Sequence, residues 1–186
     1  MTHAVDWHGQ LCEQLDWHWR TSARPRLDGL TDDEYRWEPV PGCWNVRPRG
    51  TGTAPIEAGR GPFTCDFAEP EPDPTPVTTI AWRLAHVTVG CFGARTASHF
   101  GGPAYDTMTY AYPGDAATAL TALDTTYAAW RDAVRSLDAD ALARPVGPAE
   151  VWFHASPMAA LVFHINREAI HHLAEVALLR DLFARR

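Results

Sequence analysis

The residues of this chain best suited to chemistry are an acid and an imidazole in its last long segment, Glu168 and His172. They are four residues apart, so on a helix their side chains lie on adjacent turns of one face. Leu161, Ile165 and Val176 share that face, which should therefore be buried. Burying such groups without a charge or hydrogen-bond partner costs several kcal/mol, so they must be neutralised, hydrogen-bonded or bound to a metal.

A third candidate, His86, lies at the centre of the mostly apolar face of an earlier helix. If the two helices face each other, His86, Glu168 and His172 could surround one metal ion. Two imidazoles and one carboxylate leave coordination positions open, as in catalytic sites, and suit Zn, Ni or Fe(II). The alternative interpretation is a Glu168–His172 hydrogen bond in the core, with His86 merely packed.

Other polar residues of the last segment compete with this set or assist it. His164, four residues before Glu168, could extend the site to four ligands. His171 is turned by about 100° from His172, so the two rings cannot both point inward. Glu175, one turn beyond His172, could accept a hydrogen bond from its second ring nitrogen.

Four amphipathic helices are expected to position these groups. Thr78 or Thr79 can cap the second helix, Asp115 the third, and Ser156 the last, with Pro157 at its first position. A short helix should begin at Thr31, where Glu34 completes a capping box. Four helices with one apolar face each are buried most simply as an all-α four-helix bundle. The expected ranges are about 6–24, 79–100, 115–137 and 156–186.

A long stretch rich in Gly and Pro separates the first helices from the second bundle helix. It runs from Pro39 to Pro76, far longer than an ordinary connection, and is predicted to be an irregular insertion. Its aromatic residues favour a packed cover over a site, with residues 44–47 nearest to a ligand. With the neighbouring helices, it supplies the candidate substrate-binding residues Trp44, Arg47, Trp82, His164 and Glu175.

Composition excludes several classes of protein. The 186 residues carry a formal charge of −7, and the sequence contains arginine but no lysine. An acidic chain with scattered arginines lacks the basic patch that nucleic-acid binding requires. No apolar run is long enough for a membrane span, and no secretory signal is evident. The four cysteines lack zinc-finger spacing and are expected to be reduced, so a cytoplasmic protein is predicted.

Three pieces of sequence resemble the DinB-like (YfiT-like) superfamily of metal-binding four-helix bundles. In chain order they are WNVRPRG, TTIAWRLAHVTVG and NREAIHHLAEVALLRDL. The resemblance covers nearly the whole chain, so residues 1–186 are interpreted as a single DinB-like domain. It implies metal ligands at His86, Glu168 and His172. Most members of the superfamily have a histidine where this chain has Glu168. A glutamate at that position resembles the mycothiol-dependent branch, which includes maleylpyruvate isomerase and holds zinc with a His–Glu–His set.

The resemblance implies thiol S-transfer or isomerisation on a small electrophilic substrate. The expected cofactors are one divalent metal ion, zinc before nickel or iron, and a low-molecular-weight thiol such as mycothiol or bacillithiol. A metal with an open position would lower the pKa of that thiol. The alternative is a non-catalytic, metal-containing stress or resistance protein that binds a small molecule. Homodimers are common for this architecture, so a homodimer is a further expectation.

Overall fold

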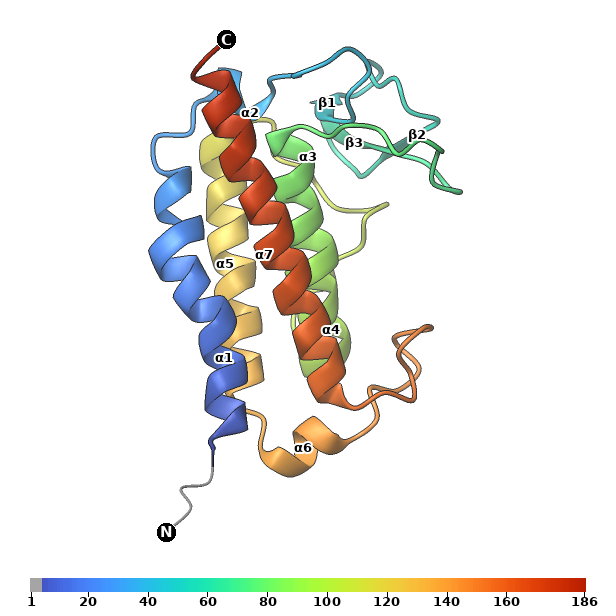
Figure 1. The fold of residues 1–186 in the computed structure, drawn as a ribbon. Coiled ribbons are helices and arrows are strands. Elements are labelled where there is room, and N and C mark those ends of the chain that lie inside the picture. Colours follow the sequence, from blue (N-terminus) through green and yellow to red (C-terminus); the bar gives the residue numbers. More distant parts are fainter. Residues whose placement is uncertain (1–4) are drawn as a thin grey trace.

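The structure is a computed structural model that describes residues 5–186, and it is mostly helical, as expected. Helical segments from four parts of the chain lie lengthwise beside one another (Figure 1). They are α1 (Trp7–His18), α3 (Ile80–Ala85) continued by a π-helical stretch (His86–Gly93) and α4 (Ala94–Phe100), α5 (Ala116–Arg135), and α7 (Met158–Phe183). The short helices are α2 (Asp32–Tyr35) and α6 (Ala139–Ala143); α6 was not predicted.

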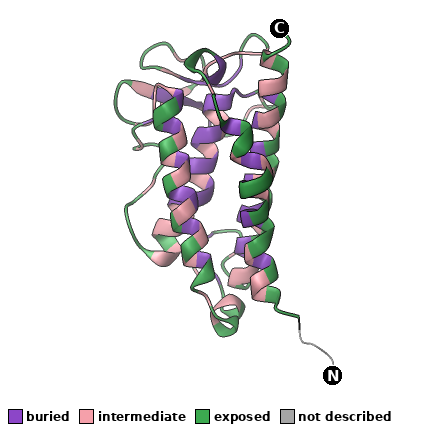
Figure 2. Ribbon diagram, turned by 90° about the vertical axis from the view of Figure 1, so that its left-hand side faces the viewer, coloured by how far each residue is buried: buried purple, intermediate pink, exposed green. Residues whose placement is uncertain are grey.

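The core lies between the apolar faces of these segments, where Figure 2 shows the buried residues turned inward. Leu123 and Trp130 of α5 pack there with Leu161 and Ile165 of α7, all almost completely buried. Burying one such side chain stabilises the fold by about 1.5–3 kcal/mol. Within residues 5–186, no helix combines the length and the apolar character needed to cross a bilayer.

Side-chain caps begin three of the helices where the sequence predicts them. Thr31, Thr79 and Asp115 accept hydrogen bonds from the backbone N–H three residues on, at 3.3, 3.3 and 2.8 Å. The start of α7 differs, because Pro157 precedes its first residue and Ser156 makes no side-chain cap. Instead the Met158 N–H donates to the Arg144 carbonyl at 2.8 Å, so neighbouring backbone replaces the expected cap.

The predicted irregular insertion is in part a small antiparallel sheet, so the all-α prediction is wrong for this region. Its strands are β1 (Val46–Pro48), β2 (Ile56–Ala58) and β3 (Phe63–Phe67), in the order β1-β3-β2. Strands this short, between Gly and Pro, leave little alternation to recognise in the sequence. The sheet lies beside the start of α3 (Figure 1), where Trp44 exchanges backbone hydrogen bonds with Val77 and Thr79 at 2.9 and 3.0 Å.

Candidate metal centre

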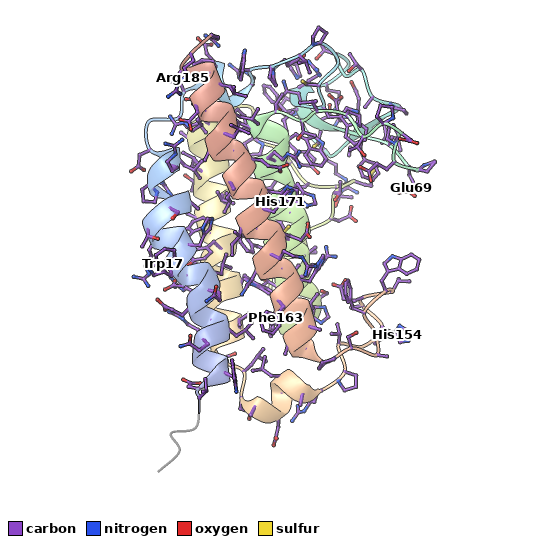
Figure 3. The ribbon with its side chains drawn as sticks, in the orientation of Figure 1. Trp17, Glu69, His154, Phe163, His171 and Arg185 are labelled. Atoms are coloured by element: carbon purple, nitrogen blue, oxygen red, sulfur yellow. The ribbon has the colours of Figure 1, made fainter. Side chains whose placement is uncertain are left out.

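The three donors expected to meet are brought together by the fold. His86 begins the π-helical stretch, Glu168 and His172 lie on α7, and one ligand atom from each is within 4.8 Å of the others. The two imidazole rings are nearly perpendicular, with centroids 4.7 Å apart. Figure 3 labels His171, the residue immediately before His172 on α7.

The position of the His86 ring is fixed from the side of the sheet. The Trp82 ring stacks on the His86 ring with centroids 5.4 Å apart and an interplanar angle of 5°. The indole N–H of Trp82 donates to the Asp66 carbonyl of β3 at 2.8 Å. The wider π turns begin at His86, a backbone form often found at functional sites.

Both histidines are kept neutral by burial. Burial lowers the pKa of His86 to about 3, and the nearby charges of His172 and Arg83 add to that effect. Burial also lowers the pKa of His172, although its hydrogen bond to Glu175 opposes the shift. A neutral imidazole has a free nitrogen lone pair, which is the form that binds a metal ion.

The outer nitrogen of His172 is held by a carboxylate. His172 Nδ1 lies 2.7 Å from Glu175 Oε2, and an Arg83 nitrogen lies 3.0 Å from the same oxygen. Arg83 is also 3.0 Å from Nδ1, but this nitrogen cannot donate to Glu175 and accept from Arg83 at once. We assign the proton to Nδ1, donating to Glu175, which leaves the Nε2 lone pair facing Glu168 at 3.5 Å.

The donor set fits a divalent metal ion better than a hydrogen-bonded core pair. His86 makes no side-chain hydrogen bond to any residue in 5–186, and its half-buried ring lines the cleft described below. A half-buried imidazole without a protein partner is open to a ligand, and a metal ion would bind its lone pair. Two neutral imidazoles and one carboxylate within reach of one point form a set that Zn, Ni or Fe(II) accepts.

The three donors open onto a cleft of about 460 Å³ between the helices and the sheet region. This volume is in the range of small-molecule sites. Trp44 and Trp82 line the cleft, as the sequence led us to expect. Residues that sequence reasoning missed also line it, including Cys65, Phe67, Thr78, Thr107 and Tyr112.

Three other candidate substrate-binding residues lie outside that lining. Arg47 is bound to Asp66 at 3.0 Å and to Glu38 at 2.6 Å, so it ties the sheet together. His164 lies 2.9 Å from an Arg167 nitrogen and 3.7 Å from Glu168, outside the cleft. Glu175 supports His172 as described above, and it does not line the cleft.

A second group of donors shares His172. One atom each from His171, His172 and Glu175 also lies within 4.8 Å of the others. The His171 side chain is 62% exposed and does not line the cleft, and Glu175 is paired with Arg83. The group containing His86 is therefore the better enclosed of the two.

Comparison with known proteins gives one family. A search of curated proteins and a search of solved structures each return no match. The family model of the DinB superfamily matches residues 14–176, a range that contains all three donors, the whole of α3, α4 and α5, and most of α7. The match spans well over half of the chain, which therefore belongs to the DinB superfamily.

Proposed function

We propose that this chain is a metal-dependent enzyme, built as a four-helix bundle, that catalyses thiol S-transfer or isomerisation on a small electrophilic substrate. The observation that supports it is the half-buried His86 ring, without a hydrogen-bond partner in residues 5–186, beside Glu168 and His172 on one cleft wall. When bound, a divalent ion such as zinc supplies the Lewis acidity that lowers the pKa of a thiol of the mycothiol or bacillithiol type.

The chain itself provides binding, orientation and exclusion of water. His86 and His172 would be neutral ligands, and Glu168 would add one negative charge. Glu175 holds the second nitrogen of His172, and Arg83 holds Glu175. Aromatic side chains on the sheet side of the cleft lower the local dielectric, which strengthens charge interactions at the reacting atoms.

A non-catalytic role in stress or resistance is the second candidate, and one observation favours it. The histidines that line the cleft are the two proposed ligands, and Glu175, the nearest further carboxylate, is engaged by His172 and Arg83. Within the described residues, the cleft lining therefore offers no histidine besides the two proposed ligands to act as a general acid or base. A protein that only binds a small molecule needs no such group.

Metal content and adduct formation test the proposal in sequence. The purified protein should contain about one divalent ion, by elemental mass spectrometry, that is lost in His172→Ala and retained in His171→Ala. The metal-loaded protein, with a thiol and a generic electrophile, should then give a thioether adduct that neither metal-free protein nor His172→Ala produces. Metal content equal in the two variants would refute the metal site, whereas metal without any adduct would favour the binding role.

A further inference from the structure

The charges that line the cleft are strongly unequal. Glu69, Glu71 and Glu168 line it, whereas Arg83 is the one basic side chain among its lining residues and is already paired with Glu175. Arg47, the nearby cation of the sheet, is neutralised by Glu38 and Asp66 outside the cleft. Apart from a bound metal ion, the cleft lining of the described chain therefore offers a ligand carboxylate no cationic side chain that lacks a carboxylate partner.

Two of these carboxylates lie where the cleft meets solvent. Glu69 and Glu71 are exposed, and neither forms an ion pair or a hydrogen bond with another residue in 5–186. Figure 3 shows Glu69 at the outer edge of the cover, away from the helical core. Clefts walled by protein focus the field of such charges and raise the local concentration of oppositely charged solutes.

A separate observation points to a ligand deeper in the cleft. Thr78 lines the cleft, is only 4% exposed, and its hydroxyl has no hydrogen-bond partner among the described residues. The adjacent Thr79 differs, because its hydroxyl donates to Asn45 at 2.8 Å and caps α3. Buried hydroxyls are normally paired, so the Thr78 side chain is suited to bond a polar group of a bound molecule.

We infer that the cleft binds a small molecule that carries a cationic amine. Glu69 and Glu71 bind the ammonium group at the mouth, the aromatic walls pack on an apolar middle, and Thr78 hydrogen-bonds a polar group further in. The inference rests on the proposed function for the reacting end, which faces His86, Glu168 and His172. The two negative charges at the mouth disfavour a substrate whose outer end is a carboxylate.

The test uses three probes that share a phenyl ring and differ in terminal charge: phenethylamine, 2-phenylethanol and 3-phenylpropionate. Binding to the purified protein, with and without zinc, is measured by calorimetry or by saturation-transfer NMR. The amine should bind roughly three- to tenfold more tightly than the alcohol, and the carboxylate more weakly than both. Because the mouth is exposed, this preference should shrink at high salt.

Matched variants separate the mouth from the general acidity of the protein. The double variant Glu69→Gln, Glu71→Gln should abolish the preference for the amine over the alcohol. Asp73→Asn should preserve it, because Asp73 is exposed in the same segment but does not line the cleft. Equal binding of the three probes, no binding of the amine, or equal effects of the two changes would overturn the inference.

The deeper contact has its own control. Its probe is tyramine, which adds a phenol hydroxyl at the end opposite the ammonium of phenethylamine. Thr78→Val should weaken binding of tyramine by roughly fivefold, the loss expected for one neutral hydrogen bond, and leave binding of phenethylamine unchanged. Thr88→Val should not weaken binding of tyramine, although Thr88 is as buried and its hydroxyl is also unpartnered, because it lies outside the cleft. The two proposals can fail separately. If the protein binds no metal but still prefers the amine, the proposed function is refuted and this inference is supported.

Discussion

The support that Glu175 gives His172 can be tested without touching a proposed ligand. In Glu175→Gln the hydrogen bond to His172 Nδ1, now 2.7 Å, would lose its charge, and Arg83 would lose its carboxylate partner at 3.0 Å. Both changes make the Nε2 lone pair of His172 a weaker donor. We expect the variant to fold and to bind zinc less tightly than the unmodified protein.

The size of the effect follows from the kind of contact that is removed. Carboxylates that hold the second nitrogen of a histidine ligand typically contribute 10–100-fold to metal affinity. This corresponds to about 1.4–2.7 kcal/mol. The upper half of the range is expected, because the Arg83 guanidinium left beside His172 also disfavours a nearby cation.

Competition with a chelator of known zinc affinity gives the dissociation constant, and His171→Ala provides the matched control. His171 also lies close to Glu175, at 3.4 Å, but outside the cleft, so this change should leave zinc affinity unaltered. The reasoning is refuted if Glu175→Gln binds zinc as tightly as the unmodified protein. Abolition of binding in both variants, with retention in His86→Ala, would instead place the ion between His171, His172 and Glu175.

Three further outcomes are expected. The pKa of His86 is about 3 in the folded protein and has its ordinary value of 6.5 in the unfolded chain. Between these pH values only the unfolded chain takes up the proton, so the metal-free protein should lose stability as pH falls through that window. The loss is at most about 1.4 kcal/mol per pH unit, and urea titrations of His86→Gln should show a shallower pH dependence. Arg47→Ala removes the guanidinium that pairs with Asp66, a carboxylate that is 2% exposed. The free energy of unfolding, measured by urea denaturation, should fall by about 3 kcal/mol. Trp82→Phe keeps a ring against His86 but loses the bond to β3, so stability should fall by about 1 kcal/mol, with zinc affinity reduced less than tenfold by the same chelator assay.

The long helices and the pairing of Glu168 with His172 could be predicted because their signals are local. Caps such as Thr79 and Asp115 act on backbone groups three residues away, and Glu168 and His172 share a face by spacing alone. That His86 joins them also required the two helices to be neighbours, which the family resemblance suggested. The cleft and its distances confirm that geometry, while the identity of the ion stays a prediction.

The wall opposite the helices could not be predicted, because its signals are not local. Strands of three to five residues pair according to register, and register depends on contacts between distant residues. Arg47 illustrates the difficulty. In the sequence, an arginine near a tryptophan resembles a ligand-binding group. In the folded chain, however, Asp66 and Glu38 neutralise its charge through ion pairs that form when β1 and β3 pair. From the sequence, Thr78 is a candidate only for capping a helix. In the structure Thr79 is the cap, which leaves the Thr78 hydroxyl free for another role.

Two polar side chains that line the cleft are left without a hydrogen-bond partner by the part of the chain that the structure describes. The half-buried His86 ring makes no side-chain hydrogen bond within residues 5–186, and the unpaired, buried Thr78 hydroxyl costs stability. Outside the cleft the pattern is mixed: the buried Asp16 carboxylate is satisfied by Tyr127 at 2.6 Å and by two arginines, whereas the buried Thr88 hydroxyl is also unpaired. Natural proteins tolerate such violations chiefly at functional sites, where a bound partner removes the cost. The meeting of His86, Glu168 and His172 at this cleft, more than the unpaired hydroxyls, is thus the argument for ligand binding that is independent of the family match.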